Sequence, residues 1–149
     1  MVLTKDEFDS LLHELDPKID TEEHRMELGL GAYTELFAAH PEYIKKFSRL
    51  QEATPANVMA QDGAKYYAKT LINDLVELLK ASTDEATLNT AIARTATKDH
   101  KPRNVSGAEF QTGEPIFIKY FSHVLTTPAN QAFMEKLLTK IFTGVAGQL

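Results

Sequence analysis

One histidine in this sequence has surroundings that suit a ligand to a bound metal. His100 follows Leu88, Ile92 and Ala96 at intervals of four residues, so it continues an apolar helix face to the helix end. Pro102 then stops that helix. A neutral imidazole at such a place can bind a metal ion. The alternative is a purely structural role, because a positively charged side chain is also favoured near a helix C-terminus.

The other residues supply no second set of catalytic groups. The chain has no cysteine, which excludes thiol nucleophiles and thiolate metal sites. No two of its five histidines have the three- or four-residue spacing that puts zinc ligands on one helix face. The sequence also lacks a glycine-rich phosphate loop and a Gly-x-Ser-x-Gly motif. We therefore do not expect an enzyme of the hydrolytic or phosphoryl-transfer classes.

Composition limits the class of protein and its partners. The 149 residues, 43% of them hydrophobic, predict a single domain over residues 1–149. The net charge is −5 and the basic residues are scattered, so we expect neither nucleic acid nor an anionic membrane as a partner. No apolar run reaches membrane-spanning length, and the first residues lack an apolar signal segment. We expect a soluble cytoplasmic protein.

Helical periodicity and capping signals run through the whole chain and predict an all-α fold with about eight helices. A capping box at residues 4–7 begins the first helix, which we expect to end near Pro17. Pro41 suits the first position of a short helix. The clearest amphipathic segment covers residues 62–80.

Further signals divide the second half of the chain. Either Ser82 or Thr83 can cap the helix that leads to His100. A second capping box at residues 106–109 opens another helix, and we expect Pro115 to bend it because proline lacks an N–H donor. No run of alternating polar and apolar residues indicates a strand.

Two segments carry a resemblance to a known family. The stretch that begins at His100 resembles the proximal segment of globins, His-x-x-Arg-x-Val-x-x-x-x-Phe, with Arg103, Val105 and Phe110 at the matching positions. Residues 36–49 resemble the globin segment in which a proline opens the short third helix and a phenylalanine, here Phe47, closes it. The resemblance extends over nearly the whole chain in helix order.

This resemblance implies a globin fold that encloses haem b (iron protoporphyrin IX). In that fold the Nε2 atom of His100 binds the iron, and the other ring nitrogen donates to a carbonyl of its own helix near Ala96. The remaining roles that the resemblance implies are packing on the haem for Phe47, contact with the haem edge for Val105 and Phe110, crowding of the ligand site for Leu71, and pairing with a haem propionate for Arg49 or Arg103. The alternative for the two arginines is a solvated surface charge.

The resemblance also implies how the oxygen side of the pocket is built. Gly29 falls where globins place a small residue, so that two helices can cross closely, and Ala68 is its expected partner. Tyr33 lies one turn beyond Gly29 and should project into the pocket. Of the two neighbouring tyrosines, Tyr67 shares a helix face with apolar residues, whereas Tyr66 lies on a polar face. Tyr67 is therefore the inward one.

Tyrosines at both distal positions resemble the haemoglobins of parasitic flatworms (trematodes). Two phenol groups can donate hydrogen bonds to bound dioxygen, each contributing roughly 1.5–3 kcal/mol, which would slow its release by about a hundredfold or more. We therefore expect a monomeric oxygen-storage or scavenging protein that also binds carbon monoxide and nitric oxide. The alternatives are a haem enzyme that oxidises nitric oxide or reduces peroxide, and a cofactor-free helical interaction module.

Overall fold

Residues 2–149, which the computed structural model describes, form seven α-helices and several shorter helical turns, with no strand in this range. The α-helices are α1 (Lys5–Ile19), α2 (Glu22–Ala39), α3 (Asp62–Ala81), α4 (Glu85–Thr95), α5 (Gly107–Thr112), α6 (Glu114–Val124) and α7 (Pro128–Ala146). Turns of 3-10 helix cover Pro41–Lys46, Ser48–Leu50, Val58–Ala60 and Lys101–Arg103, and a π-helical turn covers Ala96–His100. The predicted all-α fold is confirmed, with several of the expected short helices present as single turns.

The helix starts follow the capping signals at most positions. Both predicted capping boxes are present: Thr4 accepts a hydrogen bond from the Glu7 N–H at the start of α1, and Ser106 accepts one from the Glu109 N–H at the start of α5. The cap of α4 was predicted wrongly. Asp84 accepts the Thr87 N–H there, whereas the Ser82 hydroxyl is buried and donates to a carbonyl of α3.

Two prolines affect their helices differently. The expected end of α1 near Pro17 is wrong, because the helix continues to Ile19, whose side chain is buried in the core. A proline in the last turn interrupts little of a helix, and burial of Ile19 favours the longer one. Pro115 has a larger effect: the predicted single helix is divided into α5 and α6 at Gly113.

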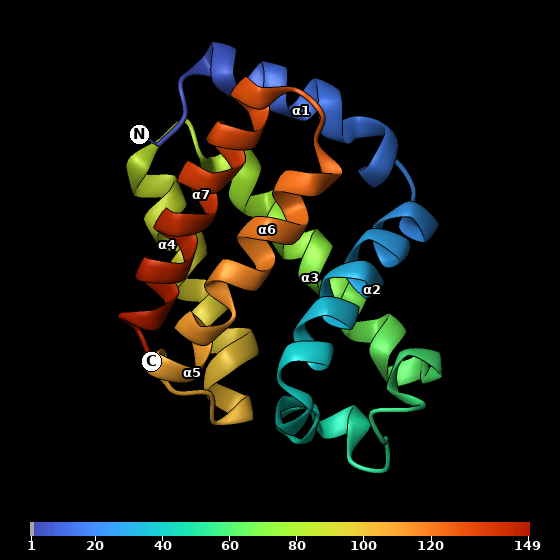
Figure 1. Cartoon of the computed structure of the whole chain (residues 1–149). Helices are drawn as coiled ribbons and strands as arrows, with labels where there is room; N and C mark the ends of the chain where they lie inside the picture. Colours follow the sequence, from blue (N-terminus) through green and yellow to red (C-terminus); the bar gives the residue numbers. More distant parts are fainter. Residues whose placement is uncertain (1) are drawn as a thin grey trace.

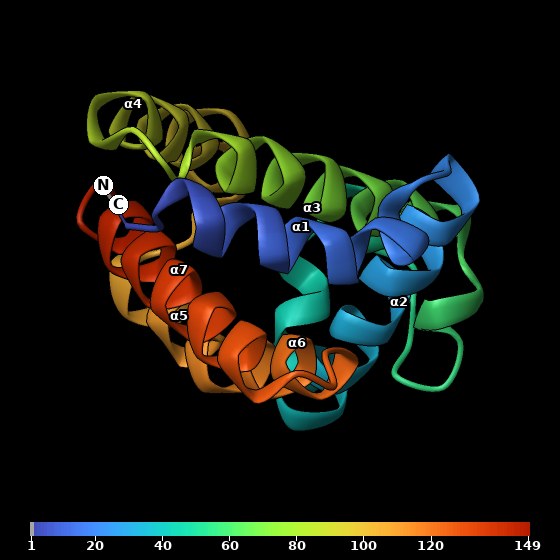
Figure 2. The same cartoon turned by 90° about the horizontal axis from the view of Figure 1, so that it is seen from above.

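Helices α2 and α3 cross in close contact, as the small residues predict. A Cβ atom on Gly29 would overlap the backbone carbonyl of Ala68, so only glycine fits at this crossing. In Figure 1, α2 passes in front of α3, while α1 lies across one end of the molecule and α6 and α7 pack side by side. Figure 2 shows α1 between α3 and α7, both of which it contacts.

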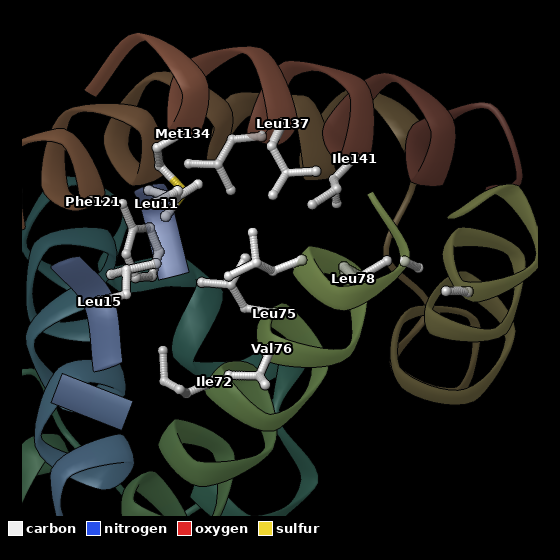
Figure 3. Packing of buried hydrophobic residues seen from close by; sticks show 14 of the residues in the cluster. Leu11, Leu15, Ile72, Leu75, Val76, Leu78, Phe121, Met134, Leu137 and Ile141 are labelled. Carbon is white, nitrogen blue, oxygen red and sulfur yellow. The ribbon is translucent and has the colours of Figure 1, made fainter. Parts of the chain in front are cut away.

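The buried side chains form two clusters. The larger one joins α1, α2, α3, α4, α6 and α7, and Figure 3 shows Leu11 and Leu15 of α1 beside Phe121 of α6 and Met134 of α7 within it. The smaller cluster joins α2, α3 and the turns between them, with Tyr33, Phe47 and Tyr67 among its members. Leu71 and Phe117 pack against both clusters, which identifies the boundary between them as the place to look for a cavity.

A polar network connects α1 to the start of α7. Asn130 is buried and donates to the Glu14 carboxylate at 2.8 Å and to the Ser10 carbonyl at 3.2 Å. Glu14 also accepts hydrogen bonds from the backbone N–H groups of Thr126 and Thr127. Partial burial alone would raise the pKa of Glu14, but these hydrogen bonds outweigh it and lower the pKa to about 2.

Within residues 2–149 there is no helix with the length and apolar character needed to cross a membrane.

Candidate functional site

A cavity of about 370 Å³ lies between the two buried clusters. This volume is within the range of roughly 300–1,000 Å³ that is usual for small-molecule and cofactor sites. All nine residues assigned to a site from the sequence line it, namely Tyr33, Phe47, Arg49, Tyr67, Leu71, His100, Arg103, Val105 and Phe110. The fold therefore brings together residues that are up to 77 positions apart in the chain.

His100 ends the π-helical turn that follows α4, and its ring is held on two sides. The Nδ1 atom lies 3.1 Å from the carbonyl oxygen of Thr95, so Nδ1–H donates there and Nε2 keeps its lone pair. The Phe110 ring meets the imidazole edge to face, with 4.6 Å between the ring centroids. The acceptor was predicted one residue later, near Ala96; the π-helical turn brings the carbonyl five residues back into reach.

The imidazole of His100 is neutral at physiological pH. Burial, together with the nearby positive charge of Arg103, lowers the pKa of His100 to about 4. A neutral imidazole with one nitrogen engaged and the other free is the form that binds a metal ion. Among residues 2–149 no group of three or more His, Asp or Glu side chains could hold a metal ion, so His100 does not belong to a polydentate protein site.

The two predicted tyrosines both line the cavity, and each contacts Phe47. Tyr33 is 6% exposed and Tyr67 is 9% exposed, whereas Tyr66 is 44% exposed, which confirms the predicted facing of α3. The Phe47 ring meets both buried tyrosines, with centroid distances of 5.5 Å to Tyr33 and 4.8 Å to Tyr67. Burial raises the pKa of Tyr33, and the Arg103 guanidinium offsets part of that rise, so the phenol stays protonated as a hydrogen-bond donor.

The two candidate arginines have different surroundings. The Arg103 guanidinium lies over the Phe47 ring, 4.5 Å from its centroid, and its Nε atom is buried without a hydrogen-bond partner. The Arg49 guanidinium instead lies over the exposed Tyr66 ring at 3.9 Å. Arg103 is thus the cation with an unsatisfied donor inside the cavity.

Several contacts at the site were not predicted from the sequence. The Tyr67 hydroxyl lies 3.2 Å from the Ser48 Oγ and accepts the Arg49 backbone N–H at 3.2 Å. Side chains of the polar segment around Ser48 gave no sequence signal, because their contacts depend on how the turn after Phe47 is oriented.

A second unpredicted contact joins Lys46, at the end of the turn Pro41–Lys46, to Asn104 and to Glu109 of α5, and both Lys46 and Glu109 line the cavity. The Lys46 amine donates to the Asn104 carbonyl at 3.0 Å and forms an ion pair with Glu109 at 3.2 Å. Asn104 has a positive φ of 56°, a conformation that asparagine tolerates better than most residues.

Two acidic side chains meet in the cavity wall. Burial, followed by the hydrogen bond with Asp99 and repulsion from it, raises the pKa of Asp74 well above its usual range. Asp74 shares the inward face of α3 with Tyr67 and Leu71, a signal already present in the sequence. A partly buried carboxyl group on an otherwise apolar face indicates a polar contact with a neighbouring element.

Comparisons with known proteins agree with this arrangement. Residues 30–145 match the family model described as Globin. A protein of Dicrocoelium dendriticum named Globin is 36% identical over 140 residues, which cover 94% of this chain and 90% of that protein. Among solved structures, ferric Aplysia limacina myoglobin is similar in fold, with a TM-score of 0.80, 18% identity and coverage of 98% of both chains.

Because the sequence match is independent of the fold, the likeness to globins is not a chance similarity between helical bundles. The match also favours oxygen binding over the enzymatic alternatives and over a cofactor-free module. With a family match over most of its length and a trematode relative at 36% identity, the chain belongs to the globin family, the haem-based oxygen-binding proteins.

Proposed function

We propose that this globin binds dioxygen tightly and releases it slowly, in a role of storage or scavenging. The observation that carries the proposal is the presence of two buried tyrosines, Tyr33 and Tyr67, in a cavity that also contains a neutral histidine with a free Nε2 atom. We further propose that the chain forms one domain and acts as a cytoplasmic monomer, and that carbon monoxide and nitric oxide bind at the same site.

The residues of the cavity suit haem b. His100 would hold the haem iron through its free Nε2 atom, and the Thr95 carbonyl fixes the orientation of the ring. Phe47, Leu71, Val105 and Phe110 supply apolar contacts for the porphyrin. A porphyrin carboxylate supplies the acceptor that the buried Nε atom of Arg103 lacks, which favours Arg103 over Arg49 as the propionate partner.

Bound haem would supply an iron atom able to bind dioxygen. The role of the protein residues is to stabilise and enclose the bound dioxygen. Tyr33 and Tyr67 are buried residues of the cavity wall, and a hydrogen bond from a buried phenol to a partly negative ligand is stronger than one in water. Carbon monoxide carries less negative charge when bound and gains less from the same donors.

The proposal is tested by replacing Tyr67 with Phe in the haem-loaded, reduced protein. The loss of one hydrogen bond to a charged acceptor should speed dioxygen dissociation by about tenfold or more, measured by stopped-flow absorbance. Tyr66→Phe is the matched control: it makes the same chemical change at the adjacent, exposed residue and should leave the rate within about twofold. Equal rates in the wild type and Tyr67→Phe would refute a role for Tyr67 as a donor.

A further inference from the structure

The Tyr67 hydroxyl has two hydrogen-bond partners besides any ligand, both in the Ser48–Leu50 turn that directly follows Phe47. The Arg49 backbone N–H and the Ser48 hydroxyl each lie 3.2 Å from the phenol oxygen. The Tyr67 residue as a whole is buried, at 9% exposure, while Ser48 and Arg49 are exposed, so its hydroxyl lies where the cavity wall meets this turn. Its hydrogen bonding is therefore set mainly by this turn.

The chemistry of the Arg49 N–H, the Ser48 hydroxyl and the Tyr67 hydroxyl determines which group donates in each hydrogen bond. A backbone N–H can only donate, so the phenol oxygen accepts from Arg49. The phenol proton then remains for Ser48 or for a ligand. A phenol is a much stronger acid than an aliphatic hydroxyl, and it is correspondingly the better hydrogen-bond donor of the pair. The geometry allows either hydroxyl to donate, and the acidity of the phenol favours Tyr67 as the donor to the Ser48 Oγ.

We propose that Ser48 is a positioning residue that competes with dioxygen for the Tyr67 proton. This inference rests on the proposed role of Tyr67 as a donor to dioxygen. With Ser48 present, Tyr67 must break its hydrogen bond to Ser48 before it can donate to dioxygen. The stabilisation of bound dioxygen is therefore only the difference between the free energies of these two hydrogen bonds. Ser48 thus limits how tightly dioxygen is held. A weakly polar ligand such as carbon monoxide leaves Tyr67 with Ser48.

Ser48 suits a test by substitution because its side chain is exposed, so its removal creates no cavity in the core. Ser48→Ala removes the Oγ atom that accepts the Tyr67 hydrogen bond when no dioxygen is bound. Dioxygen dissociation should then become slower by roughly twofold to tenfold, the factor that one hydrogen bond between neutral groups contributes. Ser48→Thr keeps the hydroxyl and should retain the wild-type rate.

Two further measurements separate a positioning role from a general structural one. In the carbonmonoxy form, Ser48→Ala should lower the C–O stretching frequency, because the released phenol proton brings positive potential towards the ligand. In haem-free protein with ¹³C-labelled tyrosine, the Tyr67 Cζ resonance, assigned by its loss in Tyr67→Phe, should move in Ser48→Ala and stay in Ser48→Thr. This second readout does not depend on a gas ligand.

The double variant Ser48→Ala/Tyr67→Phe distinguishes the possible failures. If Ser48 acts through Tyr67, the double variant releases dioxygen at the rate of Tyr67→Phe alone. A faster Tyr67→Phe combined with an unchanged Ser48→Ala overturns the competition while the proposed function stands. An unchanged Tyr67→Phe overturns both. A change in Ser48→Ala that persists without the phenol shows that Ser48 acts by another route and also overturns the inference.

Discussion

His100 illustrates which properties of a residue can be predicted from a sequence. Its place at the end of an apolar helix face follows from side-chain spacing, and the inward facing of Tyr67 follows in the same way, since both depend only on helical periodicity. The carbonyl that holds His100 was misplaced by one residue, because a π-helical turn leaves no trace in the hydrophobic pattern. The contact between Ser48 and Tyr67 depends on the course of a turn, which spacing does not encode.

Removal of the His100 imidazole should abolish stable haem binding. In His100→Gly the reconstituted protein should lose the spectrum of the wild-type haem complex, and added imidazole should restore much of it by occupying the vacated position. Absorbance in the Soret region during haemin titration, with and without imidazole, measures this. His13→Ala, at an exposed histidine of α1, is the control. An unaltered spectrum in His100→Gly without imidazole would exclude His100 as the ligand.

At the scale of helices, the capping boxes at Thr4 and Ser106 were predicted correctly because each is a local pattern. The continuation of α1 past Pro17 was not predicted, since burial of Ile19 against distant residues outweighs the local signal. The crossing of α2 and α3 positions both tyrosines: Tyr33 lies one turn beyond Gly29, and Tyr67 precedes Ala68.

Gly29→Ala tests that crossing. The added Cβ would overlap backbone atoms of Ala68. Backbone atoms cannot move aside as the end of a flexible side chain can, so α2 and α3 must separate. We expect a loss of about 1–3 kcal/mol or more in the free energy of unfolding, measured by urea denaturation. Gly147→Ala is the matched control, because a Cβ there meets nothing closer than 3.4 Å and should be tolerated. Equal stability of Gly29→Ala and the wild type would show that the crossing is not tightly packed.

At the scale of the whole molecule, the Glu14 network connects the first helix to the last. Its members lie more than 100 residues apart, so their pairing could not be predicted from one sequence. Several hydrogen bonds to the Glu14 carboxylate stabilise its ionised form relative to the protonated form, and this lowers the pKa of Glu14. The network thereby makes the stability of the fold depend on pH.

Glu14→Gln should lower the free energy of unfolding by about 1–3 kcal/mol at pH 7, because the hydrogen bonds lose their charged acceptor. The folded-state pKa of Glu14, about 2, lies below its ordinary value of 4.5, so the contribution is present above pH 4.5 and is lost as the pH falls towards 2. The stability difference between the two proteins, measured by urea denaturation at several pH values, should therefore narrow over that interval. Glu52→Gln, at an exposed position, should show no such difference. A difference independent of pH would contradict this account.

The contact of Lys46 with Asn104 and Glu109 bears on the order of events during folding. Lys46 and Glu109 are 63 residues apart, and the segment between them contains α3 and α4. Closing so long a segment is entropically costly until those helices have packed. We therefore expect this contact to form late in folding, after both halves of the chain have formed their helices. In the proposed haem complex we expect the same contact to slow the release of haem, because Lys46 and Glu109 both line the cavity.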